Sequence, residues 1–270
     1  DSLARGTVWA FDHLGNILPG WPVRIPYVDF SIGSPTLANF DSDTMDLEIL
    51  VPGRNGGFYI FDSGGAILSG WPVESWYFPD FNCHSAAVDF GGDGLCEVIT
   101  TGSYRMGVIS ASGDLWPGWP VDIGSSSRYP GNPTVGDIDG DGEWEILYTL
   151  KDRIHGFETD GTELAGFPLV CPDEIYGAPT LGDINGDGEM DIVVGCYDSR
   201  VYVWETGSPY TPEALAWPTD RGNFRRTGLY GQHWDFMAAP ESPLPKEVSL
   251  SVYPNPFNAA CRIAAPPGGV

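Results

Sequence analysis

Residues 178–207 read APTLGDINGDGEMDIVVGCYDSRVYVWETG, and this stretch decides the fold. Carboxylate or amide side chains stand at every second position from Asp183 to Asp187, with glycine following and apolar runs on either side. The same arrangement occurs 46 residues earlier, where residues 132–146 read NPTVGDIDGDGEWEI. An acidic surface turn can show this spacing once by chance. Its recurrence indicates a repeated unit built around a loop suited to a divalent cation.

Two sequence markers recur along the chain with a common period. The first is an aromatic residue followed by proline, and successive copies are 50, 48, 48 and 50 residues apart. Its copies are GWPV at Gly20–Val23, GWPV at Gly70–Val73, GWPV at Gly118–Val121, GFPL at Gly166–Leu169 and AWPT at Ala216–Thr219. The second, the acidic loop, begins at Asn39, Asp89, Asp137 and Asp183, with steps of 50, 48 and 46. Two markers that share one period define a structural repeat.

Each repeat contains short runs that are bounded by Gly, Asp, Ser or Pro and are therefore predicted strands. In the fourth repeat these runs are residues 178–182, 192–196, 200–205 and 215–219. The runs IVVG and VYVW are apolar at successive positions, which suits a small sheet that is covered on both faces. The pattern predicts an all-β fold, a β-propeller of four-stranded antiparallel blades, rather than a β-sandwich with one face in water.

Three segments, SPTLANFDSD, NPTVGDIDGDGEWEI and APTLGDINGDGEMDI, each precede a strand pair and an aromatic-proline marker. In this respect the chain resembles the FG-GAP or VCBS-type repeats of integrin-like β-propellers over roughly residues 6–219. The resemblance implies blades at approximately residues 34–73, 85–121, 132–169 and 178–219, after a partial first blade in residues 1–23. The partial blade matches only third and fourth strands, so we expect upstream chain to complete it and the ring to hold about six to eight blades.

The acidic loops have the residue types that calcium requires, because this ion prefers about six to eight hard oxygen ligands. In the family that the chain resembles, the ligands are the first, third, fifth and ninth side chains and the seventh carbonyl. Carried onto the third loop, this implies Asp137, Asp139, Asp141 and Glu145, with the carbonyl of Glu143. The fourth loop supplies Asp183, Asn185, Asp187 and Asp191, with the carbonyl of Glu189. We therefore predict bound Ca²⁺ in both loops.

The first and second loops depart from this pattern. The second offers Asp89, Asp93 and Glu97 with the carbonyl of Leu95, but Gly91 stands where the third-position ligand belongs. The first offers Asn39, Asp41 and Asp43, and has Thr44 in place of the loop glycine. Either Asp46 or Glu48 could supply its last ligand. A hydrated acidic turn without a metal is the alternative interpretation for these two loops.

The composition limits the classes of partner. The chain has 270 residues, of which 13 are basic and 37 acidic, so its formal net charge is −24. This charge repels nucleic acid phosphates and anionic lipid, and no apolar run is long enough to insert into a membrane. The four loops hold 16 of the 37 acidic residues, and bound Ca²⁺ would reduce their mutual repulsion. The five cysteines form no CxxC pair, which argues against a zinc site.

The residues beyond the fourth repeat differ from it in composition. Trp217–Gly228 resembles the terminal segment of bacterial propellers of this kind, which implies that residues 220–239 cap the last blade through Arg221, Arg225 and Arg226. Residues 240–248 predict a Pro-rich linker. The sequence YPNPFN in residues 249–270 resembles the start of the C-terminal sorting domain of type IX secretion, which implies contact with secretion machinery and delivery to the medium or outer surface of a bacterium. A Pro-rich tail without this role is the alternative, and we expect any secretion signal to lie upstream.

Aromatic side chains have two predicted roles. The repeated rings Trp21, Trp71, Trp119, Phe167 and Trp217 are expected to seal grooves between blades, with sugar stacking as the alternative. The loops between blades are expected to share the face opposite the acidic loops, and they are rich in aromatic residues, including Trp76, Tyr77, Tyr129 and Tyr176. We expect this face to bind a surface glycan or an extracellular protein, unless its rings fold inward against blade edges.

No nucleophile motif accompanies the four histidines, so we expect a binding module rather than an enzyme. Two alternatives stay open: an accessory propeller of a secreted hydrolase or lyase, and a passive structural spacer.

Overall fold

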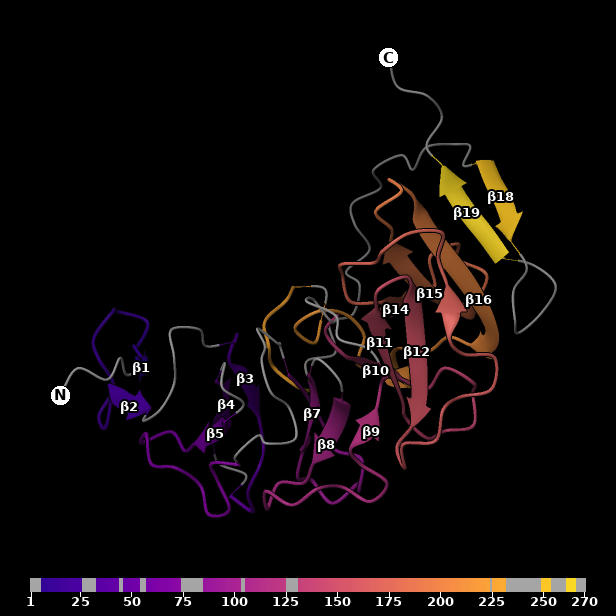
Figure 1. Cartoon of the computed structure of the whole chain (residues 1–270). Coiled ribbons are helices and arrows are strands. Elements are labelled where there is room, and N and C mark those ends of the chain that lie inside the picture. The colour runs from indigo at the N-terminus through magenta and orange to yellow at the C-terminus, as the bar shows by residue number, and fades with distance from the viewer. Residues whose placement is uncertain are drawn as a thin grey trace. The chain divides into compact units, whose positions relative to one another are not determined.

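A computed structural model describes the chain as strands and turns, with one short 3₁₀ helix at Pro212–Ala214 among the described residues. The described residues are 6–25, 33–43, 46–53, 57–73, 85–102, 105–124, 131–223, 225–231 and, for the backbone only, 249–253 and 261–265. They fall into two compact units, Asp1–Arg128 with Gly228–Tyr230, and Tyr129–Thr227 with Gly231–Val270. Each unit is described by itself (Figure 1). No helix among the described residues is long and apolar enough to cross a membrane.

The first unit contains three antiparallel sheets with the orders β1-β2, β3-β4-β5 and β6-β7-β8-β9. Its strands are β1 (Gly6–Val8), β2 (Val23–Ile25), β3 (Thr36–Ala38), β4 (Glu48–Pro52), β5 (Phe58–Phe61), β6 (Ala86–Val88), β7 (Glu97–Thr101), β8 (Arg105–Ile109) and β9 (Val121–Asp122). Every residue of β5 and β7 is buried, so both faces of these sheets are covered. In the second sheet the fourth strand is reduced to a single bridge between Phe58 and Val73.

The second unit contains two sheets, with the orders β13-β12-β11-β10-β17 and β14-β15-β16-β19-β18. Its strands are β10 (Thr134–Gly136), β11 (Glu145–Leu150), β12 (Arg153–Glu158), β13 (Leu169–Val170), β14 (Thr180–Gly182), β15 (Glu189–Gly195), β16 (Val201–Pro209), β17 (Leu215–Trp217), β18 (Ser249–Tyr253) and β19 (Cys261–Ala265). The predicted runs 178–182, 192–196 and 200–205 correspond to β14, β15 and β16, and the ends of these strands differ from the predicted ends by a few residues.

Successive sheets place their first strands side by side. In the first unit β3 lies beside β6, and Thr36 Oγ1 donates a hydrogen bond of 2.9 Å to the carbonyl of Ser85. In the second unit β10 lies beside β14, and a Cβ on Gly136 would come within 2.8 Å of Leu181 Cδ1. Small antiparallel sheets that are buried on both faces and adjoin through their first strands are blades. The predicted all-β propeller class is therefore confirmed.

The repeated tryptophans join each blade to the next one. Trp21 and Trp71 are buried, and their Nε1 atoms donate to the carbonyls of Ser63 and Ala111 in the following blade, at 3.0 and 2.9 Å. The backbones approach so closely that a Cβ on Gly20 would come within 1.8 Å of the carbonyl oxygen of Gly64. This confirms the groove-sealing prediction for these two rings. Burial leaves neither of them free to stack on a sugar.

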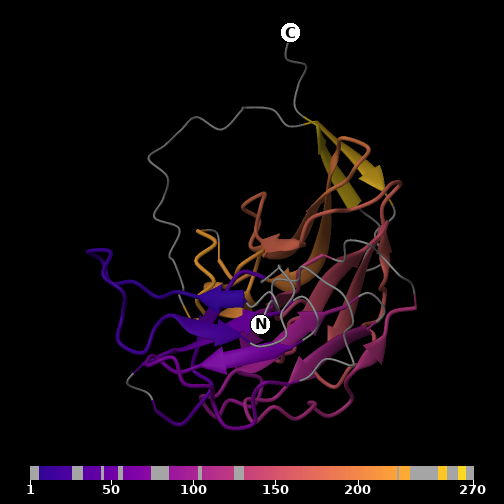
Figure 2. The same ribbon diagram turned by 60° about the vertical axis from the view of Figure 1, so that its left-hand side comes forward.

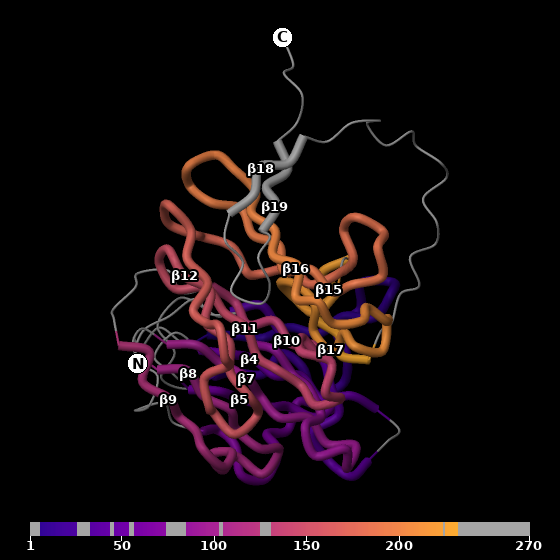
Figure 3. The backbone as a smooth tube through the Cα atoms, turned by 90° about the vertical axis from the view of Figure 1, so that its right-hand side faces the viewer, coloured from indigo at the N-terminus to yellow at the C-terminus, as the bar shows by residue number. Residues whose placement is uncertain are grey.

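The predicted strand at residues 215–219 does not belong to the fourth blade, and this expectation was wrong. β16 continues to Pro209, the 3₁₀ helix follows, and β17 then pairs with β10 of the preceding sheet (Figure 3). The physical reason is that β10 is the first strand of its sheet and offers an open edge of backbone donors and acceptors. The aromatic marker at Trp217 is retained, but its ring is buried against Gly222 rather than at an outer strand.

The segments after β17 also depart from the expected organisation. Within the first unit, Leu37 N donates to Gly228 O at 2.7 Å and Tyr230 N donates to Leu37 O at 3.0 Å, so residues 228–230 pair with β3 instead of capping the last blade. Within the second unit, β19 pairs with β16 through Val203 and Arg262 (Figure 2). The β18–β19 hairpin therefore extends the fourth blade's sheet next to β16, where β17 was expected, and does not form a separate segment.

Candidate metal centre

Each acidic loop lies between the first and second strands of its blade, and the first side chain of the second, third and fourth loops shapes the turn. In the third loop, Asp137 accepts hydrogen bonds from Gly140 N at 2.7 Å and Gly142 N at 3.2 Å. In the fourth, Asp183 accepts from the backbone N–H groups three and five residues later, at 2.6 and 2.9 Å. Gly142 has φ +94°, a conformation that glycine adopts without strain. The alternating acidic sequence thus folds into a tight turn around its own first carboxylate.

The ninth side chain closes each loop from the second strand. Glu97, Glu145 and Asp191 are buried, and one oxygen of each accepts the backbone N–H of the loop's second residue, at 2.9, 2.5 and 2.9 Å. Glu48 makes the equivalent bond to Phe40 N at 2.7 Å. Of the two alternatives for the first loop, Glu48 therefore holds the ninth-position place and Asp46 does not.

Three oxygens in these loops are buried without a hydrogen-bond partner among the described residues. They are Glu145 Oε1, Asp191 Oδ1 and Asn39 Oδ1. The amide nitrogen of Asn39 is held by the carbonyl of Gly94 at 2.6 Å. A buried oxygen without a partner destabilises a protein unless something satisfies it. A cation inside each of these loops would satisfy the buried oxygen of that loop, so the residues present fit a metal.

Burial also raises the pKa of the ninth-position carboxyls. Desolvation is the largest cause in each case, and neighbouring carboxylates add to it. The pKa is raised to about 8 for Glu145, to about 7 for Glu97 and to about 6 for Asp191. The pKa of Glu48 is raised as well, for the same reason. These sites lack positive charge, and a divalent cation would supply it.

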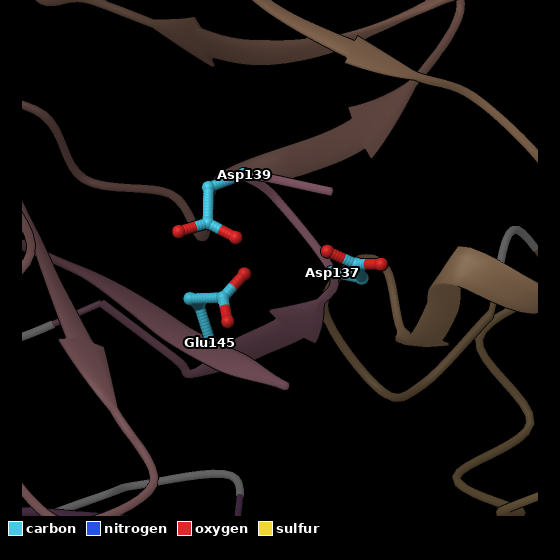
Figure 4. A group of neighbouring side chains, drawn as sticks. All are labelled: Asp137, Asp139 and Glu145. Atoms are coloured by element: carbon cyan, nitrogen blue, oxygen red, sulfur yellow. The ribbon is translucent and has the colours of Figure 1, made fainter. Parts of the chain in front are cut away.

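The third loop brings three predicted ligands together. One oxygen from each of Asp137, Asp139 and Glu145 lies within 4.8 Å of the others, and the carboxylates of Asp139 and Glu145 point toward one another (Figure 4). Asp141 instead accepts from Glu143 N at 2.8 Å, so its side chain folds back on the turn. In the fourth loop Asp187 accepts from Glu189 N at 2.9 Å in the same way.

The second loop keeps the fold of the other loops despite Gly91. Asp89 accepts from Gly92 N and Gly94 N at 2.7 and 2.8 Å, and Asp93 accepts from Leu95 N at 2.9 Å. In the first loop Asp41 accepts from Asp43 N at 2.6 Å. Thr44, which replaces the loop glycine, lies outside the described residues.

Two carboxylates beside the loops were not predicted from the sequence. Glu158 pairs with Glu145 across the β11–β12 ladder, and Glu205 pairs with Asp191 across the β15–β16 ladder. Glu205 Oε1 accepts from Asn185 Nδ2 at 3.3 Å. The signal was the acidic residue at the end of the third-strand run in the third and fourth repeats. It could be used only once the strand register was known.

The predicted ligand-binding residues are only partly described. Trp76, Tyr77 and Tyr129 lie outside the described residues. Tyr176 is 53% exposed, and Tyr197, which the sequence did not indicate, is 71% exposed. Their ring centroids are 5.5 Å apart in an edge-to-face arrangement, and Tyr176 donates a hydrogen bond to Glu174. Both residues lie at the end of the β15–β16 pair opposite the fourth acidic loop.

Comparison with known proteins supports the repeat assignment. The FG-GAP repeat family matches residues 176–204, which contain the fourth acidic loop. No curated protein sequence matches significantly. The structure of BBS1N in complex with ARL6DN, soaked with mercury, is similar with a TM-score of 0.51 and 13% identity over 98% of this chain and 74% of that one. At this identity the similarity concerns the fold alone.

Two other solved structures are similar at lower TM-scores. The Vibrio cholerae biofilm matrix protein Bap1 has a TM-score of 0.44 and 18% identity over 67% of this chain and 38% of its own. A protein of unknown function from Bacteroides caccae has a TM-score of 0.43 and 10% identity over 73% of this chain and 64% of its own. The chain therefore spans less than two thirds of either protein.

Proposed function

We propose that the chain is a calcium-binding β-propeller of a protein that is secreted or held on the outer surface of a bacterium, where it acts as an adhesion or ligand-binding module. The observation that carries the calcium assignment is Glu145 Oε1, a fully buried carboxylate oxygen without a hydrogen-bond partner among the described residues. The carboxylate of Glu145 points toward that of Asp139 in the third loop (Figure 4). Asp191 Oδ1 repeats this arrangement in the fourth loop. Calcium suits both loops because it accepts many oxygen ligands in flexible geometry.

In this proposal calcium is structural. Asp137, Asp139 and Glu145 would hold the ion in the third loop, where it would stabilise the turn between the first and second strands of the blade. The ion would neutralise carboxylates that burial has deprived of water. The protein's own part is to hold the carboxylates in place through the hydrogen bonds from Gly140, Gly142 and Ile138 backbone N–H groups.

The ligand in this proposal is a surface glycan or an extracellular protein, bound on the face opposite the acidic loops. Tyr176 and Tyr197 support this assignment because two exposed rings lie together there, and tyrosine is enriched at binding hot spots. Trp76, Tyr77 and Tyr129 stay proposed as further ligand-binding residues. Residues 249–270 are proposed to engage type IX secretion machinery, and no catalytic role is assigned to the chain.

Removal of calcium tests the metal assignment. A ligand at about 100 times its Kd stabilises a protein by about 2.7 kcal/mol per site, which corresponds to about 5–10 °C in Tm for a domain of this size. We expect the Tm of the calcium-loaded chain to fall by at least this amount in chelator, and Asp139→Ala, which removes the ligand oxygens, to reproduce the part due to the third loop. A chelator-insensitive Tm would reject the assignment.

Binding to a glycan array and to a panel of extracellular matrix proteins tests the ligand assignment. The double variant Tyr176→Ala with Tyr197→Ala should weaken binding at least about tenfold, or about 1.4 kcal/mol, with an unchanged Tm. Ile184→Ala is the matched control, because Ile184 is 55% exposed but lies in the fourth acidic loop. Equal binding by wild type and the double variant would reject this face as the ligand site, whereas no binding by wild type would favour a passive spacer.

A further inference from the structure

The fourth loop differs from the third at its third position, where Asn185 replaces Asp139. An asparagine offers one oxygen and one NH₂ group, so its amide must be turned the right way for the oxygen to face a cation. Asn185 Oδ1 accepts from Asp187 N at 2.9 Å, as Asp139 Oδ1 accepts from Asp141 N at 3.2 Å. The oxygen of Asn185 therefore occupies the place that a carboxylate oxygen occupies in the third loop.

A carboxylate from β16 contacts the other side of this amide. Glu205 Oε1 lies 3.3 Å from Asn185 Nδ2, and Glu205 is only 9% exposed. Glu205 stands directly across the ladder from Asp191, whose second oxygen is fully buried without a partner. The NH₂ group also donates to Asp187 Oδ2 at 2.7 Å. Both amide hydrogens are thus engaged by carboxylates, and this fixes the orientation of the side chain.

The corresponding places beside the first and second loops do not have this arrangement. Beside the first loop the corresponding residue is Asp62, which follows Phe61, the partner of Ile49 in the ladder. Beside the second loop it is Ser110, which follows Ile109, the partner of Val98. Asp62 accepts from Ala66 N at 2.8 Å, and Ser110 accepts from Asp114 N at 3.3 Å. Each serves its own hairpin turn. The longer side chain of Glu205 reaches the metal loop instead.

We infer that Glu205 is a positioning residue of the fourth calcium site, which it serves by holding the amide of Asn185 so that Oδ1 faces the ion. The inference rests on the proposed calcium function. Residues that orient a ligand in this way typically contribute about 10–100-fold to metal affinity. Glu205 also adds one negative charge next to a loop in which asparagine has removed one.

Calorimetric titration of the full chain with CaCl₂ tests the inference. Glu205→Gln should lower the affinity of one site about tenfold, whereas Glu213→Gln, an exposed glutamate of the same repeat, should leave the isotherm unchanged. In an Asp183→Ala background, which removes the first-position ligand and disables the fourth site, Glu205→Gln should cause no further change. An aspartate at position 185 has no amide to orient. In the Asn185→Asp background, Glu205→Gln should therefore reduce the calcium affinity of the site by a factor at least about three times smaller than in wild type. This difference is the coupling that a double-mutant cycle measures.

The melting curve in chelator separates positioning from a merely structural role. Glu205→Gln removes a buried negative charge near Asp191, so the calcium-free variant should melt at the wild-type temperature or above it. A lower calcium-free Tm, an unchanged isotherm, or the same loss in the Asn185→Asp background would overturn the inference while leaving the calcium function intact. An isotherm without calcium uptake by wild type would overturn both.

Discussion

Replacement of Trp71 by alanine tests whether the repeated tryptophans hold neighbouring blades together. The side chain is 7% exposed and packs in a cluster with Leu50, Phe58 and Ile60. Removing a buried tryptophan ring typically costs about 3–5 kcal/mol. Because domains are stable by only about 5–15 kcal/mol, this change should remove a large part of the total. We expect a matching decrease in the free energy of unfolding.

Trp71→Phe isolates the hydrogen bond within this effect. Phenylalanine keeps much of the apolar contact but leaves the carbonyl of Ala111 without the Nε1 donor that lies at 2.9 Å. Because this hydrogen bond is only partly buried, its loss should cost less than the value of about 1–3 kcal/mol for a fully buried acceptor. Trp9→Ala is the control, since Trp9 is 52% exposed and its loss should cost less than about 1 kcal/mol.

Urea denaturation in excess calcium, followed by circular dichroism, measures all three variants. Circular dichroism is preferred because the substitutions themselves alter tryptophan fluorescence. If Trp71→Ala cost no more than Trp9→Ala at equal m values, the sealing role of the repeated ring would be refuted.

Two further predictions concern other parts of the fold. Gly20→Ala should destabilise the chain by at least about 1 kcal/mol more than Gly15→Ala in thermal melts, because both glycines have positive φ but only a Cβ on Gly20 would collide with a neighbouring carbonyl; equal Tm values would contradict the close approach. Burial holds the pKa of His155 below its ordinary value of 6.5, against the opposing effect of Glu163. The neutral ring's contribution to the free energy of unfolding is therefore fully present above pH 6.5 and is lost as the pH falls below it. Between pH 6.5 and 5, Tm should fall less in His155→Gln than in wild type. Parallel profiles of Tm against pH would exclude this role.

The blade period and the loop chemistry could be predicted from the sequence because both are local patterns. The aromatic-proline marker and the acidic loop recur together, and each loop is closed by hydrogen bonds within about nine residues. The burial of Trp71 followed from its place in the repeat. The ninth-position carboxylates were predicted for the same reason, apart from the choice between Asp46 and Glu48.

Features that depend on long-range pairing could not be predicted. Leu215–Trp217 carries a degenerate copy of the marker, yet its strand joins β10, because an open sheet edge rather than the marker decides where it pairs. Residues 228–230 pair with β3 for the same reason. Glu205 became recognisable only through its register opposite Asp191, and Tyr197 only through its exposure next to Tyr176.

Anomalous X-ray diffraction from a crystal grown in CaCl₂ tests the central claim most directly, because it locates the ion rather than its effect. The account predicts a calcium peak in the third loop at about 2.3–2.6 Å from Glu145 Oε1 and Asp139, and another in the fourth loop at the same distance from Asp191 Oδ1. Loops of unchanged conformation without an anomalous peak, in which a water molecule bonds to Glu145 Oε1, would contradict it.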